Sequence, residues 1–367
     1  MRHMKTAYLT LADGTVFKGQ SFGAEKEVIG EVVFTTAMTG YLETLTDPSY
    51  HGQIVLQTFP LIGNYGIIKE DFESHRIQPT AYIVKHPCST PSNFRSSGDI
   101  GAFLKQAGIP GLCGIDTRQL TKIIRTHGVI NGKITFDAPA TEKELQEVKN
   151  FSIMDALSKV SLKDDYDFSG DGKYKVVLID YGAKRNIAKE LIKRGCSVKV
   201  MGHDVSAQEV MAQNPHGIML SNGPGDPDDP KNAPVIQTIK TLQETGIPIF
   251  GICLGHQLMA LANGYKTKKM RFGNRGSNQS AKELATGRVY ITSQNHGYAV
   301  EAENPSWINV NDGSCEGIDY GVSFSVQFHP EACGGPWDTT FLFDRFIERM
   351  TGRFACDQTQ KHMKGGK

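Results

Sequence analysis

One stretch, residues 248–262, constrains the fold more than any other part of the chain. A short apolar run over residues 247–252 leads into a turn at Cys253 and Gly255, and a helical pattern of apolar residues follows over 258–262. This order is typical of a buried strand, a sharp turn and a helix. A cysteine in the turn lies at the N-terminus of the helix, where the macrodipole and the free N–H groups favour a thiolate.

Cys253 can be interpreted in two ways. A cysteine in such a place often behaves as a small buried hydrophobic residue without a chemical role. Gly251 and Gly255 favour instead a tight, exposed turn, because glycine allows close approach of the backbone and unusual φ values. We therefore predict that Cys253 is a nucleophile.

A nucleophilic cysteine needs a base, and the base needs a group that orients it. Residues 322–328 alternate and are rich in β-branched and aromatic side chains, which predicts a strand that ends in His329, Pro330 and Glu331. Residues two apart in an extended chain point to the same side, so Glu331 can hold the imidazole of His329. Taken alone, this sequence also fits a charged pair in a surface loop.

Residues 251–257 and 328–332 resemble the two signatures of class I glutamine amidotransferases, which use a Cys-His-Glu triad. The resemblance extends over the whole chain to the small, glutaminase subunit of carbamoyl-phosphate synthetase. Four further segments carry this resemblance. The two that lie nearest the N-terminus, 31–41 and 45–50, are outside the amidotransferase domain, so they separate this subunit from other class I amidotransferases. The four segments are residues 31–41, 45–50, 180–186 and 221–227.

The resemblance implies hydrolysis of L-glutamine by a covalent route. Cys253 attacks the side-chain amide and forms a γ-glutamyl thioester. His329 takes the thiol proton and gives it to the leaving ammonia, while Glu331 orients His329 and stabilises its charged form. A serine in the N-terminal domain reaches across the domain interface to the bound glutamine. The pocket residues that the resemblance implies are Ser49, Gly223, Gly225, Leu254, Gln257, Asn295, Gly297 and Tyr298.

Two backbone N–H groups are needed to stabilise the oxyanion that forms during the attack. Leu254 follows the nucleophile and supplies one of them. The loop over residues 223–225 supplies the other, and Gly225 is the better donor because the central proline has no N–H. Without the resemblance this loop fits a simple turn equally well. His256 and His296 compete for the role of base, but we expect them to pack or to form structural hydrogen bonds.

The sequence predicts an α/β protein with two domains. Residues 1–150 have the pattern of a β-rich α+β domain, for which we expect a docking role. The resemblance implies that this domain also holds part of the glutamine site. Residues 151–174 are polar, which favours an exposed linker. Residues 175–352 alternate strand and helix patterns, which predicts a mostly parallel sheet covered on both faces, with catalytic groups at the carboxyl ends of its strands. The polar residues 353–367 are expected to form a flexible tail.

The individual elements follow from the same patterns. In the first domain we expect strands at 7–11, 16–21, 31–36, 54–58 and 81–84, and helices at 100–106 and 117–126. In the second we expect strands at 176–180, 197–202, 217–221, 247–251 and 322–328, and helices at 185–194, 233–245, 258–262 and 341–350.

Composition excludes several classes of partner. The formal net charge is +1, so the chain lacks the strong excess of positive charge that is typical of nucleic-acid-binding proteins. No apolar run approaches the about 18–20 residues of a membrane span. The 7 cysteines are scattered singly, which indicates reduced thiols and a cytoplasmic protein. No metal is expected, because Cys253 and His256 lack the second pair of ligands that a zinc site needs.

The resemblance implies a partner, the large subunit of a carbamoyl-phosphate synthetase. That subunit takes the ammonia and uses ATP, Mg²⁺ and bicarbonate to make carbamoyl phosphate for arginine or pyrimidine biosynthesis. No cofactor is expected on this chain, which has no GxxxxGK[ST] phosphate loop. Two alternatives stay open. The first is a glutaminase subunit of another synthetase, which residues 31–50 disfavour. The second is a docking or regulatory subunit whose triad is inactive without its partner. The intact triad disfavours a degenerate site, but activity that depends on the partner stays open.

Overall fold

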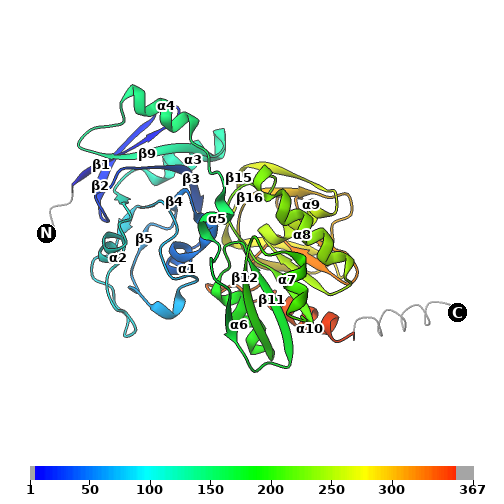
Figure 1. Ribbon diagram of the computed structural model, residues 1–367. Coiled ribbons are helices and arrows are strands. Elements are labelled where there is room, and N and C mark those ends of the chain that lie inside the picture. The colour runs from blue at the N-terminus through cyan, green and yellow to red at the C-terminus, as the bar shows by residue number, and fades with distance from the viewer. Residues whose placement is uncertain (1–4, 353–367) are drawn as a thin grey trace. The chain divides into compact units, whose positions relative to one another are not determined.

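The structure, a computed structural model, describes residues 5–352, which form two compact units (Figure 1). Among the described residues, unit 1 comprises 5–156 and 269–278, and unit 2 comprises 157–268 and 279–352. The tail expected at 353–367 lies outside the described residues. Among the residues that are described, no helix has the length and the hydropathy needed to cross a membrane.

Unit 1 is built around a closed barrel with the strand order β1-β2-β8-β6-β4-β3-β9. Alternate residues of the strands point inward, so Leu9 pairs with Ile134 and Val32 with Ile54 in the barrel core. The strands are β1 (Thr6–Leu11), β2 (Val16–Ser21), β3 (Val28–Thr35), β4 (Gln53–Gln57), β6 (Ala81–Val84), β8 (Gly111–Cys113) and β9 (Ile130–Phe136), with β5 (Leu61–Ile62) and β7 (His86–Pro87) in a separate pair.

Helices α2 and α3 of unit 1 begin at aspartate side-chain caps. Asp99 accepts a hydrogen bond from the backbone of Ala102, and Asp116 accepts one from Gln119, each at 2.9 Å. These caps fix the two helices that the sequence predicts. The helical elements are α1 (Tyr41–Thr46), η1 (Pro48–Tyr50), η2 (Lys69–Asp71), α2 (Ile100–Gln106), α3 (Thr117–His127) and α4 (Glu142–Asn150).

A segment distant in sequence completes unit 1. Residues 269–278 form the middle of the long strand β15 (Lys266–Glu283). Phe272 stacks on Phe34 with ring centroids 6.0 Å apart, and Lys269 forms an ion pair with Glu31 at 2.8 Å. The sequence patterns do not show this arrangement, because each contact joins residues more than 200 positions apart.

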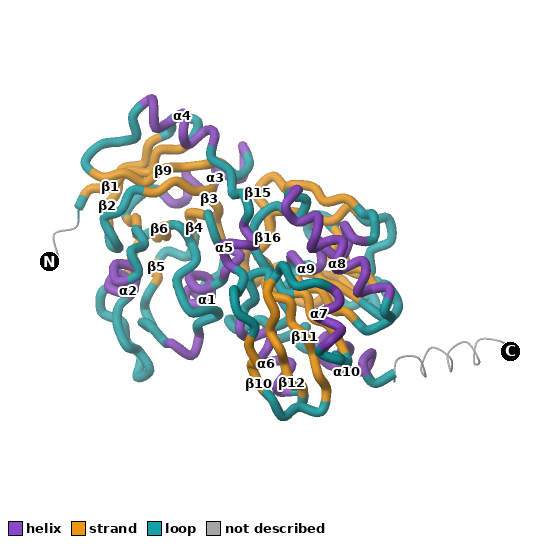
Figure 2. The backbone as a smooth tube through the Cα atoms, in the orientation of Figure 1, coloured by secondary structure: helices purple, strands orange, loops and turns teal. Residues whose placement is uncertain are grey.

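Unit 2 contains a sheet with the order β10-β12-β11-β13-β14-β19-β18-β16-β15-β17. Figure 2 shows β10, β12 and β11 side by side at one end of this sheet. Strands β12, β11, β13, β14 and β19 are mutually parallel. The strands are β10 (Tyr166–Ser169), β11 (Tyr174–Asp180), β12 (Cys196–Gly202), β13 (Gly217–Leu220), β14 (Ile249–Ile252), β16 (Val289–Glu301), β17 (Trp307–Asn309), β18 (Cys315–Asp319) and β19 (Phe324–Val326).

Helices cover both faces of this parallel region, as the sequence predicts. Val176 and Leu178 of β11 share a core with α6 and α10, whereas Val177 and Ile179 share the opposite core with α7, α8 and α9. The helices are α5 (Ala156–Val160), α6 (Arg185–Lys193), α7 (Ala207–Ala212), η3 (Pro230–Asn232), α8 (Ala233–Glu244), α9 (Leu254–Ala262) and α10 (Phe341–Met350). Each strand and helix that the sequence predicts is therefore present, with its ends shifted by a few residues at most.

The stretch expected to be a linker contains regular structure. It carries α5 and β10, and β10 pairs antiparallel with β12 at the edge of the sheet, with Tyr166 opposite Val200. Phe168 packs against the core of unit 2. The many polar residues of this stretch conceal the strand, because an edge strand exposes half of its side chains to water.

Candidate active site

Cys253 lies in a sharp turn between β14 and α9. Its backbone has φ 53° and ψ −103°, a strained combination for a residue other than glycine. Hydrogen bonds hold the turn, from Cys253 N to Val326 O at 2.9 Å and from Gly255 N to Ser221 O at 3.0 Å. The tight turn that the sequence predicts is confirmed.

The expectation that this turn is exposed is wrong. Only 2% of Cys253 is exposed to solvent. The thiol lies against β16, where its Sγ donates to the carbonyl oxygen of Asn295 at 3.7 Å. The glycines that flank Cys253 therefore serve close packing. A Cβ at position 251 would lie 2.8 Å from Gly255 O, and one at 255 would lie 2.4 Å from Leu220 O.

We expect Gly255→Ala to lower the free energy of unfolding by about 1–3 kcal/mol, because the added methyl group collides with backbone atoms that cannot rotate away. Gly170→Ala is the matched control, since a Cβ at Gly170 meets no atom within 4 Å. Urea denaturation of both variants measures the difference. Equal stabilities for the two variants would contradict the close packing around Cys253.

His329 and Glu331 form a buried pair. His329 Nδ1 lies 2.7 Å from Glu331 Oε1. Lys184 Nζ lies 3.3 Å from the same carboxylate oxygen and 3.1 Å from His329 Nδ1. Burial alone would raise the pKa of Glu331, but the charges of His329 and Lys184 outweigh it and lower this pKa to about 2. Glu331 is therefore a carboxylate throughout the physiological range.

The surroundings of His329 favour its charged form. Burial and the charge of Lys184 lower its pKa, but Glu331 and Cys253 raise it more strongly, to about 9. Because Nδ1 faces the carboxylate, we assign a proton to Nδ1 and leave Nε2 to exchange a proton with a reactant. His329 Nε2 is buried, and the side chain of Cys253 interacts with the same ring. The ring is thus oriented on one side and available on the other.

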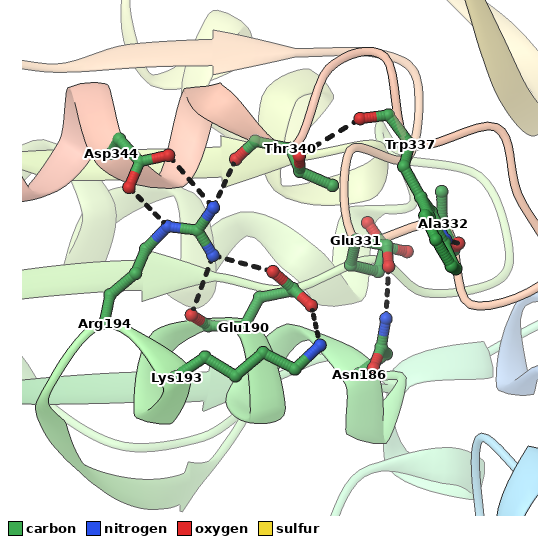
Figure 3. A network of polar contacts seen from close by, with 9 residues as sticks. All are labelled: Asn186, Glu190, Lys193, Arg194, Glu331, Ala332, Trp337, Thr340 and Asp344. Carbon is green, nitrogen blue, oxygen red and sulfur yellow. Dashed lines mark hydrogen bonds and ion pairs between the residues drawn. The ribbon is translucent and has the colours of Figure 1, made fainter.

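Two residues that hold this pair were not among the predicted site residues. Lys184 is the N-cap of α6, and its backbone N–H donates to Asn222 Oδ1 at 3.0 Å. Asn186, two residues further, donates a side-chain hydrogen bond to the carbonyl oxygen of Glu331 (Figure 3). Both lie in the segment 180–186 that carries part of the resemblance, which was the one sequence signal able to find them.

Several predicted pocket residues are joined by hydrogen bonds. Gln257 Nε2 donates to Tyr298 O at 3.0 Å and to Gln327 Oε1 at 2.9 Å. The hydroxyl group of Tyr298 donates to Asp226 Oδ2 at 3.0 Å. Gly297 precedes Tyr298 on β16, the strand that also brings Asn295 against Cys253. The structure therefore brings these residues together, and it adds Asp226, which the sequence analysis did not single out.

The two predicted oxyanion donors lie at the start of α9 and in the loop after β13. Leu254 is the first residue of α9, so its N–H has no acceptor within the helix. Gly225 has φ 92°, which glycine tolerates best. Gly223 packs tightly, because a Cβ there would lie 2.2 Å from Tyr181 O. The remaining pocket residue, Ser49, belongs to unit 1, where it is buried in η1 and donates its backbone N–H to Asp47 Oδ1 at 2.9 Å.

The two competing histidines have structural contacts, as expected. His256 is fully buried, and its Nδ1 lies 2.7 Å from Ser325 Oγ. Burial, with a smaller contribution from His296, lowers the pKa of His256 to about 3, so this ring stays neutral. His296 lies between Gln294 Oε1, 3.0 Å from its Nε2, and Tyr298 O, 2.8 Å from its Nδ1. His329 is the histidine that the structure pairs with a carboxylate.

Comparison with known families matches both units. Residues 177–349 match the family Glutamine amidotransferase class-I. Residues 9–134 match the family Carbamoyl-phosphate synthase small chain, CPSase domain. The chain belongs to the carbamoyl phosphate synthase small chain family. Its amidotransferase domain serves glutamine hydrolysis within the synthase, which confirms the fold and the function that the sequence resemblance implies.

Individual relatives are similar over nearly their whole length. The carbamoyl phosphate synthase small chain of Listeria monocytogenes is 47% identical, and the match covers 95% of this chain and 98% of the relative. The pyrimidine-specific small chain of Halalkalibacterium halodurans is 50% identical, with 93% and 96% covered. The small chain of Clostridium perfringens is 49% identical, with 93% and 99% covered.

Proposed function

We propose that Cys253, His329 and Glu331 form the catalytic triad that hydrolyses L-glutamine, and that the ammonia passes to a large synthase subunit. The observation that carries this proposal is the arrangement of the buried imidazole. His329 Nδ1 is held by Glu331 at 2.7 Å, which leaves the buried Nε2 to exchange a proton with Cys253 or a reactant. The Cys253 thiol lies close enough to raise the pKa of this ring.

The reaction has two halves. In the first, His329 Nε2 already carries the proton of Cys253, because the site favours the charged ring. Cys253 Sγ attacks the amide carbon of glutamine, and His329 protonates the departing nitrogen, so that ammonia leaves and a thioester remains. In the second, His329 takes a proton from water, the resulting hydroxide attacks the thioester, and glutamate leaves as the thiol is restored. We assign the stabilisation of both oxyanions to the backbone N–H groups of Leu254 and Gly225.

Glu331 and Lys184 act on His329 in opposite directions. The carboxylate raises the pKa of the ring and the ammonium group lowers it. A base that holds its proton too firmly cannot release it to the leaving nitrogen, and one that holds it too weakly cannot take it from the thiol. We infer that Lys184 offsets part of the effect of Glu331 and keeps His329 able to exchange a proton in both directions.

The pocket residues have separate proposed roles. We assign Gln257, Asn295, Gly297 and Tyr298 to the walls of the glutamine pocket, with Gly223 keeping the opposite loop close to Leu254. The side-chain amide of Gln257 is already bound to Tyr298 O and Gln327 Oε1, so its proposed contribution is to fix the wall. Ser49 is proposed to contact the glutamine from unit 1.

The name of the family implies a large subunit as partner. We propose that ATP, Mg²⁺ and bicarbonate are used by that subunit, since the sequence of this chain contains no GxxxxGK[ST] phosphate loop. Ammonia released into water becomes ammonium, so its transfer needs a shielded path between the subunits. The relative named pyrimidine-specific supports pyrimidine biosynthesis as the pathway. We further propose a role in arginine biosynthesis and a location in the cytoplasm.

Reconstitution tests the proposed partner. We expect this chain and a purified large synthase subunit to form carbamoyl phosphate from glutamine, bicarbonate and ATP at a rate well above that of either subunit alone. The large subunit supplied with ammonium chloride is the control for its own synthesis. Glutamine hydrolysis without carbamoyl phosphate, while the control is active, would contradict the partner and favour another synthetase.

A further inference from the structure

The loop that follows Glu331 is held by side chains at successive points. Asn186 donates to the carbonyl oxygen of Glu331, and the indole Nε1 of Trp337 donates to the carbonyl oxygen of Ala332 at 3.1 Å (Figure 3). Ala332 O also accepts from the backbone of Gly335 at 3.0 Å. Two consecutive peptide groups, directly after the triad carboxylate, are therefore fixed from two sides.

The backbone of this loop is strained at Ala332, and neighbouring groups must hold it in that conformation. Ala332 has φ 23°, in the left-handed half of conformational space that residues with a Cβ rarely adopt. A strained residue persists only when its surroundings determine its conformation. The hydrogen bonds to the carbonyl oxygens of Glu331 and Ala332 hold Ala332 in this conformation. Their loss would allow the loop to relax and Glu331 to move.

The far end of the same loop is attached to α6 through Arg194. All five N–H groups of this guanidinium have acceptors, and every acceptor belongs to α6 or to the start of α10. Nε and Nη2 donate to the two carboxylate oxygens of Asp344 at 2.8 and 3.0 Å, and Nη2 also donates to Thr340 O at 3.0 Å. Nη1 donates to the carbonyl oxygen and to the carboxylate of Glu190 at 3.1 and 2.7 Å.

Thr340 closes the connection back to Trp337. The Thr340 hydroxyl group donates to Trp337 O at 3.0 Å. Helix α6 thus contacts the active-site strand end through Lys184 and Asn186 at its beginning, and it contacts the end of the loop through Arg194. A helix rises about 1.5 Å per residue, so these attachment points are about 12 Å apart along α6.

We propose that α6 and Trp337 together splint the loop 332–340, and that Asn186, Arg194 and Trp337 are positioning residues for the triad carboxylate Glu331. None of the three acts on glutamine. Each holds the main chain that carries Glu331 or that follows it, and so each sets how closely the carboxylate faces His329. The inference rests on the proposed function of the triad.

Trp337 gives the sharpest test because 71% of it is exposed. Its ring contributes little to the core, so a change there need not disturb folding. Trp337→Phe keeps an aromatic ring and removes the N–H that binds Ala332 O. Tyr166→Phe is the matched control, since it removes one polar hydrogen from an exposed aromatic side chain on β10 of the same unit.

We expect Trp337→Phe to lower kcat for glutamine hydrolysis by about 3- to 10-fold, the effect of one hydrogen bond, with KM and the melting temperature unchanged. Arg194→Lys should act in the same direction, because an ammonium group cannot reproduce the five-donor fork. The rate of Cys253 alkylation by iodoacetamide, followed across pH by mass spectrometry of the Cys253 peptide, should shift in Trp337→Phe because Glu331 tunes the pKa of His329. Tyr166→Phe should match the unaltered chain in every measurement.

The alkylation profile needs no turnover, so it separates this inference from the proposed function. A shifted profile in a chain that hydrolyses no glutamine would retain the splint and refute the triad's proposed activity. Unchanged kcat together with an unchanged profile overturns the splint. A lower kcat with an unchanged profile also overturns it, because the effect then does not pass through Glu331 and His329. A melting temperature lowered by several degrees would instead assign Trp337 a structural role and overturn it likewise.

Discussion

Cys253→Ala is expected to abolish carbamoyl phosphate synthesis from glutamine while sparing synthesis from added ammonia. The expected loss is roughly 10³-fold or more, because the covalent route has no second nucleophile in place of the missing sulfur. Alanine fits the space, since Cys253 is buried against β16 and loses its Sγ contact with Asn295 O and its interaction with His329. The assay compares the two nitrogen sources with the reconstituted synthase.

Cys196→Ala controls for the loss of a buried cysteine in the same unit. We expect this variant to keep synthesis from both nitrogen sources, because Cys196 lies in the core at the start of β12, away from the turn at Cys253. Equal loss of both activities in Cys253→Ala would point to a structural role for the thiol and would contradict its assignment as nucleophile.

The chemistry of this site could be predicted from sequence because its parts are local. The triad residues come directly after β14 or a few residues after β19, and parallel strands place their carboxyl ends at one edge of the sheet. Cys253 follows β14 and His329 lies just beyond β19, and these two strands pair in parallel. Patterns a few residues long therefore determined which side chains meet, even though Cys253 and His329 are far apart in the sequence.

The environment of the site could not be predicted in the same way. Burial of the Cys253 thiol depends on β16, whose contact with the turn no local pattern reveals. The effect of Lys184 on His329 depends on how the loop after β11 folds around Asp180, whose carboxylate accepts from the backbone of Gly182 and Ala183. Long-range contacts of this kind set pKa values and strain, so these properties became visible only in the structure.

His329→Ala is expected to lower glutamine hydrolysis by roughly 10³-fold, and Glu331→Gln by a smaller factor of roughly 10- to 100-fold. Alanine removes the group that carries the proton, whereas glutamine keeps a hydrogen-bond acceptor beside His329 Nδ1 and removes only the charge. Steady-state kinetics of both variants, with glutamine as the varied substrate, measures the ratio. Equal losses would mean that orientation by Glu331 matters as much as proton transfer, or that Glu331 acts directly.

The pH profile of Glu331→Gln tests the electrostatic part of this argument. In the unaltered chain Glu331 and Cys253 raise the pKa of His329 to about 9 against the opposing effects of burial and Lys184. Removing the carboxylate charge leaves burial and Lys184 with less opposition, so the pKa of His329 must fall. The limb of kcat/KM that reports loss of the His329 proton should then move from near pH 9 to lower pH. A limb that stays in place would show that another group sets the protonation of the ring, and Glu331 would then act by orienting His329 alone.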